Sequence, residues 1–499
     1  MRLMKILALG LLAAVFLNFS VAPFQWGVLG FVALMPLLHL RTLSALRRFL
    51  IGWFAGFLTQ AFTYYWVFYT IRDFGGLSPW IAALGSTAFW LYQGLDLALW
   101  LWVYPLLAQK LGSRVTSNWT PVCHALTAAA TWWLLQKGLF PYVFPWNYGS
   151  IFASLPWLFE SVALWGVHGL GFLAVWFQAG LMEGMRRREA LGRSRLTLAV
   201  AAPLVLILTG LPFHRQVPIE TWRIAVVQPN LIPWAKRGRL TLEERVSAHL
   251  RPTLGLKGRD VDMVVWPETA MSFVLSGFDR ERRQLQFLCR ELGAPLVTGT
   301  VGKAETGEYH NEIWMFTPDG AEPQVYRKQK LVWFSEQLPW VFSWARWFDP
   351  NMGGFAPGRE TNAFRWRDRH FVPLVCFEAL LPDYVDRFRG HAILNLTNDA
   401  WFGQTKASAL HLQMIRGRAP EHGIPMVRAT NSGISCWIDR RGVVHDPTGL
   451  YTAETAIFEV PVPTTPGTSR FSWAQAFLLG LTGLSVGLTR WVGRAREPS

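Results

Sequence analysis

The distribution of apolar and polar positions divides the chain into two parts of different character. Long apolar runs nearly free of charge follow one another up to about residue 213, and one more lies near the C-terminus. Most of them have about the length that a helix needs to cross the hydrocarbon core of a bilayer. We therefore expect a membrane α-helical bundle of about eight transmembrane helices, at roughly 3–20, 26–41, 49–71, 79–108, 120–137, 160–185, 196–213 and 471–490.

The first apolar run also has the features of a signal peptide, because Arg2 and Lys5 precede it. No clear cleavage site between small residues follows, and further apolar runs come at once. A first membrane span is therefore the favoured interpretation.

The positive charges are distributed unevenly over the segments between these runs. The chain carries a formal net charge of +15, of which residues 222–462 account for only +3. If the N-terminus is cytoplasmic and the chain crosses eight times, fifteen of the nineteen Lys and Arg residues outside 222–462 lie on the cytoplasmic side. This asymmetry is typical of membrane proteins and places residues 222–462 outside the cytoplasm. It also makes a nucleic-acid partner unnecessary as an explanation of the basic pI.

Residues 222–462 have the alternating pattern of an α/β domain. Short β-branched runs predict strands near 222–231, 261–269, 294–302, 311–320, 370–378, 391–399, 425–439 and 456–462. Amphipathic stretches at 242–255, 279–293 and 406–423 predict helices between them, the second ending at Gly293. We expect three parts: a membrane domain at 1–221, the α/β domain at 222–462, and a last span with a cytoplasmic tail at 463–499.

The cysteines do not form a pattern of metal ligands or a disulfide framework. Cys123 lies in an expected span, while Cys289, Cys376 and Cys436 lie in the α/β domain, where one disulfide is possible. There is no CxxC motif and no paired histidine motif, so we expect no metal and no cofactor.

Three residues at strand ends or in loops of this domain are a workable set for nucleophilic catalysis. Glu268 and Cys376 each end a buried strand, and Lys328 lies in a loop rich in aromatic and basic residues. A thiol needs a base to become a thiolate, and a lysine ammonium can stabilise an oxyanion. Each residue alone is more often structural: a buried cysteine, a paired carboxylate and a solvated lysine.

The stretches "WPETA", "YRKQKLVWFSE", "LVCFE" and "LTNDAWFG", in this order, resemble the nitrilase superfamily with its Glu-Lys-Cys triad. Together with the apolar N-terminal half and the last span, the whole chain resembles the apolipoprotein N-acyltransferase family of bacterial inner membranes. The resemblance implies a nitrilase-like α-β-β-α sandwich for the α/β domain.

The resemblance also implies roles for individual residues. Glu268 matches the general base, Lys328 the catalytic lysine and Cys376 the nucleophile, with Lys330 as a second candidate for the lysine. Supporting acidic residues and substrate-binding positions are implied at Glu336, Glu378, Trp234, Asn311, Asn398 and Trp401.

The sequence departs from the family pattern in two places. Phe377 follows the cysteine where the family usually has a tyrosine, which removes a hydroxyl near the nucleophile. The stretch "WFSEQLP" replaces a usual "PFGEYVP"-like stretch. Both changes affect the expected local geometry rather than the triad.

The function implied by the resemblance is acyl transfer from a phospholipid to the N-terminal amine of a diacylglyceryl-cysteine in an apolipoprotein, through a cysteine thioester. We expect a monomeric, multi-pass inner-membrane protein with a periplasmic catalytic domain. A membrane-tethered amidase or nitrilase acting on a small amide is an alternative, but it leaves the spans unexplained. A transporter with an extracytoplasmic binding domain would need paired charges inside the spans, where only Asp96 and Glu160 stand out.

Overall fold

A computed structural model describes residues 3–112, 119–186, 193–211, 217–231, 241–305, 307–340, 343, 347, 353–469 and 471–494. The chain forms two compact units. The first comprises Met1–Phe68, Trp80–His214 and Ser469–Ser499, and the second comprises Tyr69–Pro79 and Arg215–Thr468.

The second unit contains two β-sheets. The seven-stranded sheet has the order β13 (Glu454–Pro463), β1 (Ile219–Gln228), β2 (Met263–Val265), β4 (Leu296–Lys303), β5 (Tyr309–Phe316) and β6 (Gln324–Arg327), with β3 (Met271–Val274) also paired to β4. The six-stranded sheet has the order β12 (Val444–His445), β11 (Cys436–Ile438), β10 (Met426–Thr430), β9 (Ala392–Thr397), β8 (Arg369–Val375) and β7 (Phe364–Trp366). The central strands of both sheets are parallel, so their carboxyl ends share one edge.

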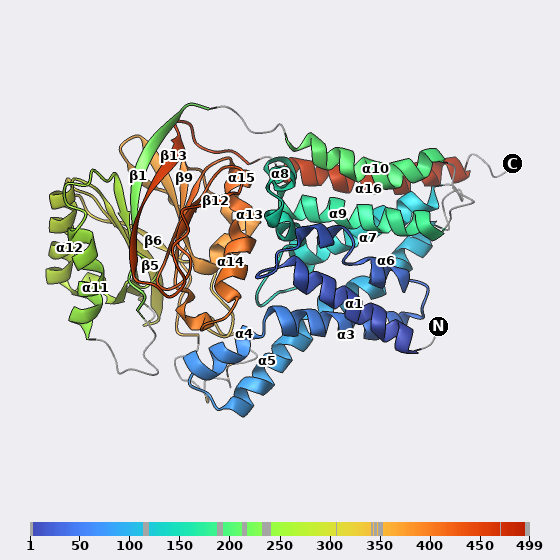
Figure 1. Ribbon diagram of the computed structural model, residues 1–499, viewed down its shortest axis with the longest axis horizontal. Helices are drawn as coiled ribbons and strands as arrows, with labels where there is room; N and C mark the ends of the chain where they lie inside the picture. Colours follow the sequence, from blue (N-terminus) through green and yellow to red (C-terminus); the bar gives the residue numbers. More distant parts are fainter. Residues whose placement is uncertain are drawn as a thin grey trace. The chain divides into compact units, whose positions relative to one another are not determined.

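Helices cover the outer faces of the two sheets (Figure 1). Helices α11 (Leu242–Leu254) and α12 (Asp279–Leu292) lie on the seven-stranded sheet, and α13 (Pro382–Val385), α14 (Ala407–Ile415) and α15 (Arg418–His422) lie on the other. Val264 and Trp266 of the first sheet pack with Leu285 and Leu288 of α12 in a buried apolar core. The expected nitrilase-like α-β-β-α arrangement is therefore confirmed for this unit.

Local signals in the sequence explain where several of these elements begin and end. Thr241 and Glu244 form a reciprocal capping box at the start of α11. Gly293 ends α12 in the left-handed conformation, as expected from the sequence. The run 425–439 is divided between two antiparallel strands, β10 and β11, because the turn "NSG" interrupts it.

The first unit is helical, and each expected span coincides with helix. Its longer helices are α1 (Leu3–Ser20), α3 (Ala45–Thr63), α5 (Pro79–Gln93), α6 (Leu95–Gly112), α7 (Thr120–Leu134), α9 (Val162–Arg186), α10 (Arg193–Thr209) and α16 (Phe471–Arg494). The short second span consists of η1 (Gly27–Phe31) and α2 (Met35–His39), and the long fourth span divides into α5 and α6 at Gly94. Among the described residues, α1 and α9 are the helices long and apolar enough to cross a membrane by length and composition.

Small residues allow close helix contacts in this unit. A Cβ atom on Gly56 of α3 would lie 2.1 Å from the carbonyl oxygen of Gly94, so only glycine fits there. Gly180 of α9 approaches the backbone of Ala199 in α10 in the same way. Such small-residue contacts are typical of helix packing in membranes.

Two buried carboxylates of the first unit, Glu183 and Asp96, have polar partners. The Arg41 guanidinium lies 2.5 Å from Glu183, a residue that the sequence did not single out. Asp96 accepts hydrogen bonds from the Tyr142 hydroxyl and the Trp146 indole, both at 3.2 Å. These contacts lie where two segments of the unit meet, as is usual for polar groups inside a helical bundle.

Candidate active site

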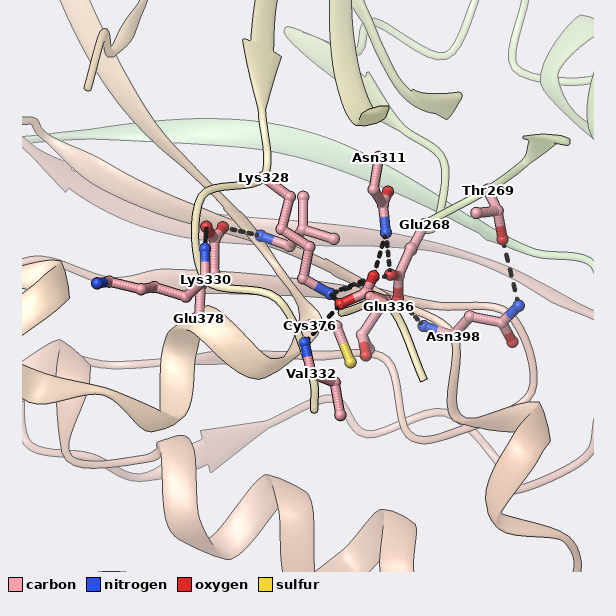
Figure 2. Close-up of polar contacts among 12 residues, drawn as sticks. Glu268, Thr269, Asn311, Lys328, Lys330, Val332, Glu336, Cys376, Glu378 and Asn398 are labelled. Atoms are coloured by element: carbon pink, nitrogen blue, oxygen red, sulfur yellow. Dashed lines mark hydrogen bonds and ion pairs between the residues drawn. The ribbon is translucent and has the colours of Figure 1, made fainter. Parts of the chain in front are cut away.

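The three candidate catalytic residues come from three separate segments of the second unit. Glu268 follows β2, Lys328 follows β6, and Cys376 directly follows β8. All three side chains are buried. Figure 2 shows that they converge on one place, with the Cys376 sulfur beside the Glu268–Lys328–Glu336 cluster.

The lysine is held between two carboxylates. Lys328 Nζ lies 2.8 Å from a carboxylate oxygen of Glu336 and 3.7 Å from Glu268 Oε1. Burial alone would lower the pKa of Lys328, but the Glu336 and Glu268 carboxylates outweigh it and raise the pKa. The ammonium therefore stays charged, as an oxyanion-stabilising group requires.

Asn311 and Asn398 fix the glutamate that we expect to be the base. Asn311 Nδ2 donates to Glu268 Oε1 at 2.8 Å and to Glu336 Oε1 at 3.0 Å. The Asn398 backbone N–H donates to Glu268 Oε2 at 2.9 Å. Gly299 of β4 leaves room for this turn, because a Cβ atom there would lie 2.7 Å from Glu268 Cα. Both asparagines therefore belong to the site because they hydrogen-bond to Glu268, the expected base.

The nucleophile candidate has an unusual backbone conformation. Cys376 has φ = +47°, between the end of β8 and the 3-10 turn η8 (Cys376–Leu380). A non-glycine residue in this region is held there by its surroundings, often at a functional site. Burial raises the pKa of the Cys376 thiol, the Glu268 carboxylate raises it further, and Lys328 opposes them. The resting thiol is therefore protonated and needs a base.

Glu268 is suited to receive that proton. Burial raises the pKa of Glu268, and Lys328 is the largest opposing influence. A carboxylate with a raised pKa is a stronger base than an exposed one. When Glu268 takes the proton of Cys376, the negative charge moves from the carboxylate to the sulfur and stays beside the Lys328 ammonium.

The two supporting glutamates have different surroundings. Glu336 contacts Lys328 directly and also accepts the Val332 backbone N–H at 2.9 Å. Glu378 instead accepts hydrogen bonds from four groups, namely the backbone N–H groups of Val375, Gln329 and Lys330 and the hydroxyl of Tyr326. Glu378 thus ties the residue before the cysteine to the residues after Lys328, and orients both through the backbone.

The competing lysine candidate points elsewhere. Lys330 Nζ lies 5.8 Å from the centroid of the Tyr384 ring. Its side chain extends away from Cys376 and Glu336 in Figure 2. This geometry favours Lys328 over Lys330 for the role at the reacting carbonyl.

The structure describes one of the two candidate tryptophans, Trp401. Trp234 lies outside the described residues. Trp401 lies in η9 (Asp399–Phe402), directly after Asn398. Its carbonyl oxygen accepts a hydrogen bond from Thr70 at 3.0 Å, and its ring lies 5.7 Å from that of Phe74. The segment 69–79 belongs to this unit, which no pattern in the sequence predicted.

Other residues near the site were not anticipated from the sequence. Burial is the largest influence on the pKa of Cys376 and raises it, whereas a hydrogen bond with the Thr397 side chain lowers it. A buried cluster of Asp399, His411 and Arg428 lies behind the turn that carries Asn398. Asp399 lies within the "LTNDAWFG" stretch, but Arg428 gives no signal, because a single arginine in an apolar strand has no distinctive spacing.

All four cysteines, Cys123, Cys289, Cys376 and Cys436, are buried and in the thiol form. The possible disulfide within the α/β domain is therefore not formed. Cys376 differs from Cys289 and Cys436 because it lies in the carboxylate–lysine cluster.

Two family models match the chain. Residues 223–468 match the carbon-nitrogen hydrolase family, and residues 13–180 match the apolipoprotein N-acyltransferase N-terminal domain. Among solved structures, a CN-hydrolase superfamily protein from Xanthomonas campestris has 19% identity and a TM-score of 0.38, over 48% of this chain and 91% of that one. An amidase from Nesterenkonia sp. AN1 has 17% identity and a TM-score of 0.38, over 48% and 92%.

Relatives named apolipoprotein N-acyltransferase cover most of the chain. The protein from Allorhizobium ampelinum is 35% identical over 325 residues, which are 60% of this chain and 60% of that protein. The protein from Pseudomonas syringae pv. tomato is 28% identical over 90% of this chain and 88% of its own length. The Brucella melitensis protein is 29% identical over 96% and 94%. With both of its domains matched and relatives of this name along nearly its full length, the chain belongs to the apolipoprotein N-acyltransferase family.

Proposed function

We propose that this protein transfers an acyl chain from a membrane phospholipid to the N-terminal amine of a diacylglyceryl-cysteine in apolipoproteins, through a thioester on Cys376. Membership of the family makes the chain a membrane-associated N-acyltransferase of lipoproteins. The observation that carries the finer proposal is the buried Glu268–Lys328–Cys376 cluster with Glu336 2.8 Å from the lysine.

The first half-reaction forms the acyl-enzyme. Glu268 takes the proton of the Cys376 thiol, and the thiolate attacks the carbonyl carbon of the phospholipid ester. The Lys328 ammonium stabilises the oxyanion of the tetrahedral intermediate. When the intermediate collapses, the ester C–O bond breaks, and the lysophospholipid alkoxide takes the proton back from Glu268. A thioester remains on Cys376.

The second half-reaction transfers the acyl chain. The lipoprotein amine attacks the thioester carbonyl, Lys328 again stabilises the oxyanion, and Glu268 takes a proton from the attacking nitrogen. The C–S bond breaks, the amide leaves, and the Cys376 thiolate is protonated by Glu268. The burial of all three side chains supports this course, because water would otherwise hydrolyse the thioester.

A transfer assay tests this function against the amidase alternative. The full-length protein, in vesicles containing phospholipid with a labelled acyl chain, is given a synthetic diacylglyceryl lipopeptide. We expect the label in amide linkage on the lipopeptide, with one lysophospholipid formed per transfer. Ammonia release from small amides without label on the lipopeptide would favour the amidase and contradict the proposal.

The topology is part of the proposal, since both substrates lie in a membrane. We propose eight spans, with the N- and C-termini cytoplasmic and the catalytic domain in the periplasm, supported by the charge asymmetry of the loops. A reporter that is active only in the cytoplasm, fused after Gly320, is expected to be silent. The same reporter fused after Arg494 is expected to be active. Activity at Gly320 would overturn the periplasmic assignment.

The transporter alternative is not favoured. It predicted paired charges within the spans, and among the described residues Glu183 of α9 pairs with Arg41, after α2, and lies 3.6 Å from His124 of α7. These contacts join neighbouring segments of the helical unit and are accounted for by helix packing. A transport function would not explain the catalytic cluster or the match to the two families.

A further inference from the structure

A fully buried arginine lies behind the candidate active site. Arg428 is in β10, and its neighbour in the parallel strand β9 is Asn395. None of the Arg428 side chain is exposed. A buried charge is costly unless it is paired and hydrogen-bonded, so we expect the contacts of this guanidinium to have a structural or functional role.

The guanidinium bonds to two segments at once. Arg428 Nη1 donates to Asn395 Oδ1 at 2.9 Å, and Nη2 donates to Asp399 Oδ2 at 2.9 Å. His411 Nδ1 lies 3.2 Å from both Arg428 Nη2 and Asp399 Oδ1. The planar fork of arginine holds two acceptors in a fixed relation, which the single ammonium of a lysine does not reproduce.

One branch leads to the nucleophile. Asn395 Nδ2 donates to the carbonyl oxygens of Leu374 and Cys376, at 3.4 and 3.5 Å. These bonds are long, so a small rotation of the Asn395 amide would break them. Arg428 prevents that rotation by holding the other end of the amide. The bonded carbonyl belongs to the residue with φ = +47°, whose conformation depends on its surroundings.

The other branch leads to the base. Asp399 directly follows Asn398, whose backbone N–H donates to Glu268 Oε2. Gly433 packs so closely against Asp399 that a Cβ atom there would lie 2.3 Å from Asp399 Oδ2. Asp399 is therefore fixed by Arg428 on one side and by close packing on another, and its position sets that of the Asn398 N–H.

We propose that Arg428 is a positioning residue for the acyl transfer: its guanidinium fixes the backbone of Cys376 through Asn395 and the backbone that binds Glu268 through Asp399. The inference rests on the proposed function, which assigns the nucleophile and base roles to these two residues. Besides a nucleophile and a base, the reaction then requires that Cys376 and Glu268 are held in fixed relative positions by one buried cation, Arg428 of β10.

The test is the Arg428→Lys variant of the full-length protein in labelled phospholipid vesicles. Lysine keeps the charge and the pairing with Asp399 but cannot hold Asn395 in the same plane. We expect the maximal rate of Cys376 thioester formation to fall about 10- to 100-fold. The phospholipid concentration at half-maximal rate should not change, because Arg428 does not line the substrate site.

Arg369→Lys is the matched control. Arg369 is also buried and ion-paired, to Glu220, and it begins β8, the strand that ends before Cys376. Arg369→Lys is expected to lower thermal stability about as much as Arg428→Lys while leaving the loading rate unchanged. An equal fall in both variants would mean that Arg428 is structural only and would overturn the proposal.

Asn395→Asp separates the two branches and remains informative if Arg428→Lys does not fold. Aspartate keeps an acceptor for Arg428 but loses the amide that donates to the Cys376 carbonyl. We expect a similar loss in loading rate, and in the double variant a loss smaller than the product of the two single losses. Loading at the wild-type rate by Asn395→Asp would overturn the Cys376 branch.

Alkylation by iodoacetamide distinguishes failure of this inference from failure of the proposed function. The rate at which Cys376 is alkylated, read by peptide mapping, depends on the orientation of the thiol and needs no lipid. If wild-type protein forms no thioester, the proposed function is wrong. The rate of Cys376 alkylation then tests the inference about Arg428 independently. Slower alkylation in Arg428→Lys than in Arg369→Lys supports it, and equal rates contradict it.

Discussion

Replacing Lys328 by arginine is expected to lower the rate of acyl transfer about 1,000-fold, whereas replacing Lys330 by arginine is expected to change it less than about threefold. Lys328 Nζ is enclosed by Glu336 and Glu268, at 2.8 and 3.7 Å, with no exposed side-chain surface. A guanidinium is larger than an ammonium and presents its charge as a plane rather than a point. Lys330 has its ammonium at the Tyr384 ring, and a guanidinium can make the same cation–π contact.

The measurement is the rate of label transfer to the lipopeptide, with thioester loading read separately. Because both half-reactions pass through an oxyanion, Lys328→Arg should be defective in loading and in transfer. Thermal unfolding of the two variants controls for stability. If Lys330→Arg is inactive and Lys328→Arg is active, the lysine has been assigned two residues too early in the chain.

Glu268→Gln is expected to block the first half-reaction, with a loss of about 10³-fold in the loading rate. Glutamine keeps the size of the side chain and an acceptor for the Asn398 N–H but cannot take the thiol proton. The raised pKa of Cys376 makes this loss large, because little thiolate forms without a base. Single-turnover loading with labelled phospholipid measures it.

The other two glutamates are the matched comparison. Glu336→Gln and Glu378→Gln should each slow one half-reaction more than the other, since Glu336 contacts Lys328 and Glu378 holds backbone on both sides of the site. Adding the lipopeptide after loading separates the two steps. Wild-type rates in both variants would make these glutamates purely structural. Loss of loading in both, equal to that of Glu268→Gln, would mean that the base role is shared.

The sequence pattern was most informative for features that depend on neighbouring residues within one helix or strand. The apolar runs coincide with helices, and Gly293 ends its helix as expected. The strand ends that carry Glu268 and Cys376 could be found because parallel strands place their carboxyl ends at one edge. The family resemblance then selected Lys328, whose loop has no periodicity of its own.

Features that depend on contacts distant in sequence were not predictable. The run 79–108 has a break at Gly94, where Gly56 of α3 approaches its backbone, and neither glycine alone indicates this. The short strands β6 and β7 lack a recognisable alternation of apolar residues. Arg428 is buried only because Asn395 and Asp399 meet it from other segments. No local pattern distinguishes such an arginine from one on the surface.

The central claim, that Cys376 carries the acyl chain, is tested most directly by mass spectrometry of the enzyme after reaction with phospholipid alone. The account predicts one acyl group per protein, mapped to the peptide containing Cys376 and released by hydroxylamine as a thioester is. Addition of the diacylglyceryl lipopeptide should remove it at the rate at which amide appears, and Cys376→Ser should carry none. An acyl group on another residue, or amide formation by Cys376→Ser at the wild-type rate, would contradict the account.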